Sequence, residues 1–379
     1  MDIDRQDIEK RLKKYELIDK ELIFNDLQNI YSVNDKSSEY VLKSIINTYC
    51  EKNRQLELIY QKRRDQLSVL KQLELPEQRS KEWYEMRKNK LTASSLADAL
   101  DKGHFQSRDE LLFYKIEEKP FEPNPITEWG VKYEDVAIKC YEQLYKVKVH
   151  EFGLIPHPDF EAFGASPDGI CDDTGNDPYI GRMVEIKCPP KRKFTKTVPP
   201  HYLMQVQGQL EVCDLDECDF FQVKIEEYEN YEDYCKDIFE IDGVLQHGRT
   251  SLNFPKGVTI TYKRGEKLSY KYCNLDQSDE ELKEWIQGYE EKDISEDIFE
   301  IKWWKITRYE CTLVHRDRVW WYETIDKILL FYKDLLMYRS NSEELSKLKN
   351  RITNSKKRRK RIEVEPLIDF QLISDDEGA

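Results

Sequence analysis

Two short segments of the chain most constrain its fold: Ser166-Pro167-Asp168-Gly169 and Met183-Val184-Glu185-Ile186-Lys187. The second segment has the composition of a strand, in which Glu185 and Lys187 project from the same face. Residues 172–178, between the segments, are rich in turn-forming residues. The pattern therefore predicts a hairpin that brings Asp168 back beside Glu185, at one end of a sheet.

Two converging carboxylates repel one another unless a cation lies between them. Oxygen ligands of this kind suit Mg²⁺ or Mn²⁺. The ammonium group of Lys187 could then orient a water molecule or stabilise developing negative charge. A Glu-x-Lys pattern alone also occurs on many solvated strands, so the surrounding motifs must decide between these interpretations.

Composition limits the location and the partners of the protein. The 379 residues are 39% hydrophobic, which supports a sizeable core, and the formal net charge is −14. Any contact with nucleic acid must therefore come from a local basic region. Nine cysteines without a Cys-x-x-Cys pair indicate a reducing compartment, and no apolar run is long enough to span a membrane. We expect a soluble intracellular protein, not secreted, in the cytoplasm or nucleus of a cell.

Composition also divides the chain into regions. Residues 1–75 are charged with helical spacing, and we expect a helical N-terminal extension that serves either as a structural appendage or as an arm for a partner. Residues 76–340 form the main domain, and 240–295 within it resemble an insertion or a long hairpin. Residues 341–379 are expected to be a disordered charged tail. Its basic run 356–361 is either a nuclear localisation signal, a DNA-binding segment or solvated chain.

Other polar residues around these segments are candidates for a site. Arg87 and Ser94 flank a predicted helix-turn-helix junction, where an arginine, a hydroxyl group and free helix N–H groups can bind a phosphate. An ordinary helix cap with a surface arginine is the alternative. Glu134 lies at the edge of the apolar face of a helix over 127–144, where it is either a metal ligand or a solvated side chain. Gln205 lies on a helix over 201–210.

A basic loop lies between the second segment and that helix. Lys191, Arg192 and Lys193 are flanked by prolines at 189, 190, 199 and 200. Lysine and arginine side chains in an extended loop are typical of contacts with a DNA backbone.

The motifs occur in a fixed order over about 145 residues, and together they closely resemble the phage lambda exonuclease type of viral recombination nuclease, in versions from large DNA viruses. The resemblance covers roughly residues 78–226. It rests on Trp83-x-x-x-Arg87-x-x-x-Leu91-Thr92-Ala93-Ser94, Trp129-Gly130-x-x-Tyr133-Glu134, Ser166-Pro167-Asp168-Gly169, Glu185-Ile186-Lys187-Cys188-Pro189 and Tyr202-x-x-Gln205-Val206-Gln207.

The resemblance implies an α/β fold with a PD-(D/E)xK restriction-endonuclease-like core, in which helices flank a central mixed sheet. It also implies roles for individual residues. Glu134, Asp168, Glu185 and the main-chain carbonyl group of Ile186 would bind Mg²⁺ or Mn²⁺, and Lys187 would position or deprotonate the attacking water. The 5′-phosphate of the digested strand would be bound by Arg87, Ser94, Ser166 and Gln205.

The function that the resemblance implies is metal-dependent 5′-to-3′ exonuclease activity on double-stranded DNA ends. The product would be a 3′ single strand for recombination, replication or repair, annealed by a partner protein. Some members of the family form ring trimers, so a homo-oligomer is expected, although the long flanks place that assembly in question. Two alternatives remain open: an endonuclease with the same centre, and a non-catalytic module that binds DNA ends.

Overall fold

The structure is a computed structural model that describes residues 4–371, apart from 16–18, 79, 104–105, 118–123, 192–193, 195, 266 and 291–296. The chain forms two compact units, residues 1–71 and 72–379. Among the described residues, none of the helices is both long enough and apolar enough to cross a lipid bilayer.

The first unit is helical, as the sequence predicts for the N-terminal extension. It contains α1 (Arg5–Leu12), α2 (Lys20–Ile30) and α3 (Lys36–Lys71). Asp35 begins α3, because its carboxylate accepts hydrogen bonds from the N–H groups of Ser37 and Ser38. The three helices share a small core, to which each contributes buried aliphatic side chains: Ile8, Leu12, Ile23, Leu27, Leu42 and Ile46.

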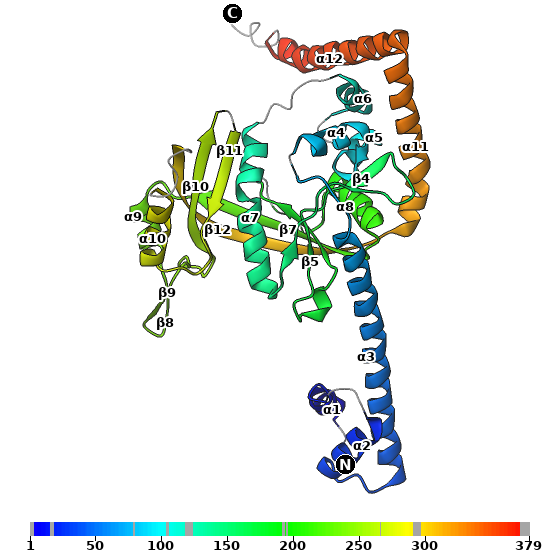
Figure 1. Cartoon of the computed structure of the whole chain (residues 1–379), viewed down its shortest axis with the longest axis vertical. Coiled ribbons are helices and arrows are strands. Elements are labelled where there is room, and N and C mark those ends of the chain that lie inside the picture. The colour runs from blue at the N-terminus through cyan, green and yellow to red at the C-terminus, as the bar shows by residue number, and fades with distance from the viewer. Residues whose placement is uncertain are drawn as a thin grey trace, which may run out of the picture. The chain divides into compact units, whose positions relative to one another are not determined.

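The second unit is built on a mixed seven-stranded sheet with the order β11-β10-β12-β7-β6-β5-β2 (Figure 1). The strands are β2 (Val149–His150), β5 (Gly169–Cys171), β6 (Met183–Lys187), β7 (Glu217–Glu227), β10 (Lys256–Arg264), β11 (Lys267–Tyr272) and β12 (Asp297–His315). The pair β6–β7 is parallel and the other neighbours are antiparallel. The predicted α/β class with a central mixed sheet is confirmed.

One long helix, α7 (Pro125–Tyr145), covers a face of this sheet. Asn124 caps its start through hydrogen bonds to the N–H groups of Ile126 and Thr127. Its buried stripe includes Tyr133, Val136 and Tyr141, and packs on the apolar residues of β6 and β7. Strand β7 has buried apolar residues on both faces, with Phe220 on one face and Phe221 and Val223 on the other.

A second layer of helices surrounds a three-stranded sheet of β1 (Leu91–Thr92), β4 (Phe163–Ala165) and β3 (Ile155–Pro156). The helical segments are α4 (Lys81–Asn89), η1 (Ala93–Ser95), α5 (Leu96–Ala99), α6 (Arg108–Ile116), α8 (Pro200–Cys213) and α11 (Arg318–Ser340). Helix α8 approaches η1 and β4 closely at Gly208. A Cβ atom there would lie 3.1 Å from Phe163 Cζ and 3.2 Å from Ala93 Cβ.

Residues 240–295, expected to be an insertion or a long hairpin, contain the antiparallel hairpin of β10 and β11, and both of these strands belong to the main sheet. A small hairpin of β8 (Phe239–Ile241) and β9 (Val244–Gln246) precedes β10 and β11, and α10 (Asp279–Glu290) follows them. Val258 and Ile260 of β10 are buried, but so are Thr259 and Thr261. This burial on both faces removes the alternation of polar and apolar residues that would have indicated a strand.

The tail expected to be disordered from residue 341 is helical over α12 (Ser342–Gln371). This segment contains no glycine, and Leu348 is fully buried. Ion pairs also attach α12 to α6, with Arg351 3.0 Å from Asp109 and Lys356 3.1 Å from Glu110. The prediction overlooked these partners because they lie more than 200 residues away in the chain. The side chains of residues 357–361 lie outside the described residues, so the structure does not test the function of the basic run.

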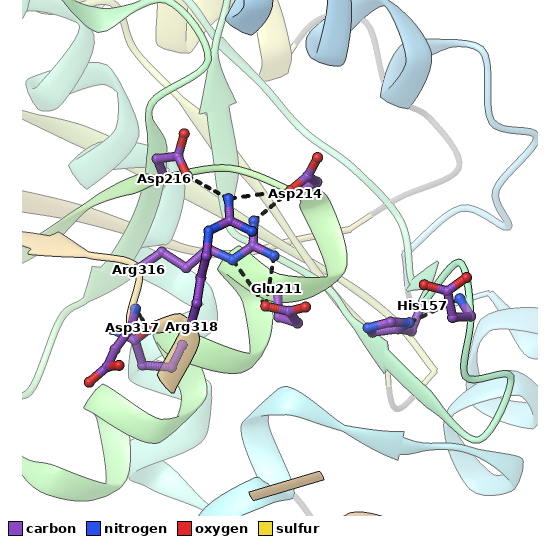
Figure 2. A network of polar contacts seen from close by, with 9 residues as sticks. His157, Glu211, Asp214, Asp216, Arg316, Asp317 and Arg318 are labelled. Carbon is purple, nitrogen blue, oxygen red and sulfur yellow. Dashed lines mark hydrogen bonds and ion pairs between the residues drawn. The ribbon is translucent and has the colours of Figure 1, made fainter. Parts of the chain in front are cut away.

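A buried arginine attaches the start of α11 to the end of α8 (Figure 2). The Arg316 side chain is 5% exposed and lies 2.7 Å from Glu211 and 2.6 Å from Asp214. The neighbouring Arg318 pairs with Asp214 and Asp216, but its side chain is 58% exposed. Gln207 of α8 completes the junction, since its amide donates to the carbonyl group of His315 and accepts from the N–H group of Asp317.

Replacing Arg316 should destabilise the second unit much more than replacing Arg318. Arg316→Met leaves the Glu211 carboxylate without its counter-ion in a poorly solvated position, and we expect a loss of roughly 3 kcal/mol in the free energy of unfolding. Arg318→Met, a control on the same surface, should cost less than about 1 kcal/mol, because solvent screens its pairs. Urea denaturation followed by tryptophan fluorescence measures this unit, since all seven tryptophans lie beyond residue 80. Equal losses in the two variants would contradict the assignment.

Candidate active site

The two acidic segments meet at the paired ends of β5 and β6, as the hairpin prediction requires. Gly169 pairs with Val184 in the antiparallel register, so Asp168 lies beside Glu185 at the next position. A hydrogen bond fixes this arrangement, because the N–H group of Ile186 donates to Asp168 Oδ2 at 2.6 Å. Glu185 is fully buried, whereas Asp168 is partly exposed.

The carboxylate of Glu185 is held by side chains from α8. Gln205 Nε2 donates to Glu185 Oε1 at 2.6 Å, and Gln209 Nε2 donates to Glu185 Oε2 at 2.7 Å. These glutamines lie one helical turn apart, so both amides reach the same carboxylate. The Gln209 amide also contacts the main-chain carbonyl oxygen of Ser166 at 3.4 Å. Helix α8 therefore fixes the position of a buried charge that belongs to the sheet.

Lys187 forms an ion pair with Glu185 from the same strand face. Its ammonium group also lies 5.0 Å from the centre of the Tyr202 ring, at the start of α8. Burial disfavours the charged form of this lysine, but the carboxylates of Glu185 and Asp168 outweigh that effect and raise the Lys187 pKa above its ordinary value.

Electrostatics connects Glu134 with the two strand carboxylates. Burial raises the pKa of Asp168 well above its ordinary value, and the negative charges of Glu185 and then Glu134 raise it further. Cys188, next to Lys187, donates to the carbonyl group of Tyr133 at 3.6 Å and so joins the end of β6 to the Glu134 turn of α7. The helix and the hairpin thus bring Glu134, Asp168 and Glu185 close enough for their charges to interact.

The donor chemistry of this neighbourhood fits a hard divalent cation. Carboxylate oxygens and the carbonyl oxygen of Ile186 are the ligand types that Mg²⁺ and Mn²⁺ prefer. Gln209 Oε1 is buried and accepts no hydrogen bond from the residues that the structure describes. Within that same set, no three Asp, Glu, His or Cys side chains lie close enough together to bind one ion. Shared ligation by Glu134, Asp168 and Glu185 therefore stays a prediction.

Arg87 and Ser94 are brought together across the junction between α4 and η1. Arg87 Nη2 donates to Ser94 Oγ at 3.1 Å, and the guanidinium group stacks over the Trp83 ring at 4.5 Å. Thr92 Oγ1 lies 3.2 Å from Ser94 Oγ. Burial lowers the Arg87 pKa, although the group stays positively charged at neutral pH. A guanidinium group and hydroxyl groups in this arrangement can bind one phosphate.

The other two residues predicted to bind the 5′-phosphate have different partners. Ser166 Oγ donates to the carbonyl group of Gly153 at 3.1 Å and lies 3.4 Å from the amide of Gln78. Gln205 binds Glu185, as described above. No hydrogen bond links either residue to Arg87 or Ser94 in the described part of the chain. In the predicted DNA-binding loop, Lys191 is exposed, while Arg192 and Lys193 lie outside the described residues.

A family of viral proteins matches this part of the chain. Residues 82–216 match the YqaJ-like viral recombinase domain. That segment contains every residue described above as part of the site except Gln78, and the match confirms the resemblance to lambda-exonuclease-type recombination nucleases that was drawn from the motifs.

An uncharacterised protein of Acanthamoeba polyphaga mimivirus is 32% identical over 320 residues, which cover 76% of this chain. The chain spans 58% of the length of that relative. Among solved structures, an alkaline exonuclease from Laribacter hongkongensis is 21% identical, with a TM-score of 0.40 over 73% of this chain and 99% of its own. A phage-related exonuclease from Haemophilus somnus is 15% identical, with a TM-score of 0.35 over 68% of this chain and 96% of its own.

Lys115 of α6 is a residue beside the site that the sequence motifs did not indicate. Its side chain is buried, and its ammonium group donates to the carbonyl groups of Arg87 at 2.9 Å and Lys90 at 2.7 Å. It thereby caps the end of α4, the helix that carries Arg87. Burial, followed by the charges of Arg87 and Arg339, lowers its pKa to about 7. A lone lysine on an apolar helix face was the only signal in the sequence.

The lowered pKa of Lys115 should make stability depend on pH. The unfolded chain keeps the ordinary lysine pKa of 10.5, so between pH 7 and pH 10 it binds more protons than the folded chain, and the free energy of unfolding rises with pH. We expect the difference between the parent protein and Lys115→Met to rise by about 1 kcal/mol per pH unit in this window. Lys81→Met, at a side chain that is 84% exposed, is the control. Parallel pH profiles for parent and Lys115→Met would exclude this assignment.

Proposed function

We propose that this chain, whose residues 82–216 match the YqaJ-like viral recombinase domain, is a deoxyribonuclease that digests one strand of duplex DNA from its 5′ end. The observation that carries the proposal is the meeting of Asp168, Glu185 and Lys187 at the ends of two paired strands. The matched segment and the motifs both include these three residues. The product would be a 3′ single strand available for recombination or repair.

Each residue of the centre has a proposed role. Glu134, Asp168, Glu185 and the carbonyl group of Ile186 would hold Mg²⁺ or Mn²⁺. When bound, such an ion would supply positive charge to stabilise the developing charges on the attacking and leaving oxygens. The amides of Gln205 and Gln209 fix the rotamer of Glu185 from the side of α8. Lys187, at the margin of the carboxylates, would orient water toward the phosphorus atom.

A second group of residues would make the enzyme depend on DNA ends. Arg87 and Ser94, bonded to each other and placed on a helix junction, would bind the terminal 5′-phosphate, with Ser166 and Gln205 joining once DNA is present. The loop with Lys191, Arg192 and Lys193 would contact the strand backbone. Because the chain carries a net charge of −14, such local contacts are required for DNA binding.

The proposal extends to partners and location. A recombination nuclease that leaves a 3′ single strand needs a protein to anneal it, so we propose a single-strand annealing protein as partner. We propose that the activity takes place in a host cell infected by a large DNA virus, in the cytoplasm or the nucleus, and the similarity to a mimivirus protein supports this setting.

Linear and covalently closed circular duplexes of the same sequence test the reaction. With Mg²⁺, we expect the linear duplex to release mononucleotides while the closed circle stays intact, and a chelator should stop the digestion. Cleavage of the closed circle would favour an endonuclease. DNA binding without any metal-dependent product would favour the non-catalytic end-binding module.

In the same assay, Lys187→Ala should reduce turnover on linear duplex by roughly 100-fold or more while DNA affinity stays within about threefold, because a preorganised charge at the reacting centre is lost. Lys224→Ala is a matched control. Lys224 also pairs with a glutamate two residues away, Glu226 at 2.7 Å, but on strand β7 and at a half-exposed position. Full activity in Lys187→Ala would remove its catalytic assignment.

Arg87→Ala tests the phosphate pocket separately. It should reduce the preference for 5′-phosphorylated over 5′-hydroxyl ends by roughly tenfold or more, since a charge-assisted contact to phosphate is lost. The rate on 5′-hydroxyl ends should change little. Lys81→Ala, at an exposed position on the same helix, is the control. If the parent protein digests both end types equally, the pocket has no such role.

A further inference from the structure

Helix α11 is apolar on two opposite faces. One face is buried in the second unit and has the spacing of a packed helix, with Trp321, Thr324, Ile328, Phe331, Leu335 and Tyr338. The opposite face also carries large apolar side chains that are exposed: Val319, Tyr322, Leu329, Leu330, Leu336 and Met337. We call this second set the outer stripe. Tyr322 is 80% exposed and Val319 is 70% exposed.

The outer stripe has the periodicity of a helix interface. Positions 319, 322, 326, 329, 333 and 336 alternate in steps of three and four residues, and therefore follow one line along the helix. The stripe spans about 27 Å at a rise of about 1.5 Å per residue. Figure 1 shows α11 at the margin of its unit, beside α5, α6 and α8. An outward helix face is normally polar, so exposed apolar side chains at four of these six positions indicate a contact surface.

Two charged residues lie within the stripe and limit what can cover it. Asp326 and Lys333 occupy the same line, seven residues apart, on either side of Leu329 and Leu330. Both are exposed, and neither forms an ion pair or hydrogen bond with the residues that the structure describes. A partner surface must therefore present a positive group near Asp326 and a negative group near Lys333, with apolar side chains between and beyond them.

We infer that the outer stripe binds the same stripe of a second copy of this chain, with the two α11 helices antiparallel. A twofold axis between Leu329 and Leu330 brings Asp326 of each copy toward Lys333 of the other, so each dimer contains two Asp326–Lys333 pairs. The same axis places Tyr322 opposite Met337 and Leu329 opposite Leu330. A parallel pairing would instead place like charges together, which is unfavourable. The inference does not depend on the proposed nuclease activity.

Sedimentation velocity on the full-length chain, over a range of concentrations, tests this inference. We expect a reversible monomer–dimer equilibrium. Leu329→Glu combined with Leu330→Glu should raise the dimer Kd by roughly 100-fold or more, since each copy loses two buried leucines. Lys327→Glu, at an exposed position on the same helix but off the stripe, should leave Kd within about threefold. Because all these side chains are exposed in a single copy, the thermal unfolding midpoint should stay constant when it is measured below the dimer Kd of the parent, and it serves as the folding control.

Charge exchange tests the antiparallel register. Asp326→Lys alone should raise Kd by about tenfold, because each dimer loses two attractive pairs and gains two repulsive ones. The double exchange Asp326→Lys with Lys333→Asp restores self-complementarity and should return Kd to within about threefold of the parent. Neither single variant measured alone, Asp326→Lys or Lys333→Asp, should show this recovery of the dimer.

Three results would overturn the inference. The first is a parent protein that stays monomeric at all concentrations. The second is a trimer or dimer whose Kd is unchanged by the leucine substitutions. The third is a dimer that the leucine substitutions weaken, but in which the double exchange at Asp326 and Lys333 does not restore the parent Kd. This result would place a different surface against α11.

Discussion

The arrangement of the second unit depends on how it accommodates one buried charge, the carboxylate of Glu185. A buried carboxylate is strongly destabilising unless each oxygen has a partner. Here the partners come from two directions, with Gln205 and Gln209 from α8 and Lys187 from the same strand. Strand β6 and helix α8 are therefore held together at this point. The amides must stay fixed relative to β6, and the packing of α8 serves that requirement.

Several long-range contacts keep α8 in that position. Arg316 and Gln207 attach its C-terminal end to the start of α11, and Val206 and Leu210 are fully buried. These contacts connect residues about 100 positions apart in the chain. They show how residues far from the candidate site in the chain help to determine where α8 lies.

Local patterns allowed much of the candidate site to be predicted from the sequence. The hairpin that places Asp168 beside Glu185, the helix with Gln205 and the proximity of Arg87 to Ser94 all follow from motifs that lie within 20 residues of each other. The remaining features depend on distant partners. Strand β10 has buried threonines, α12 is helical where ion pairs with α6 hold it, and Lys115 reaches carbonyl groups about 25 residues away. None of these has a local signature.

The close approach at Gly208 has a mechanical consequence. The bare backbone of α8 lies against Ala93 of η1, and the next residue of η1 is Ser94, the partner of Arg87. Gln205 and Gln209, the two glutamines that hold Glu185, lie three residues before Gly208 and one residue after it. With no space at this contact, the two groups must move as one rigid body. A displacement of a few tenths of an ångström caused by a ligand at Arg87 would thus be transmitted through backbone to the carboxylate, without any hinge in between.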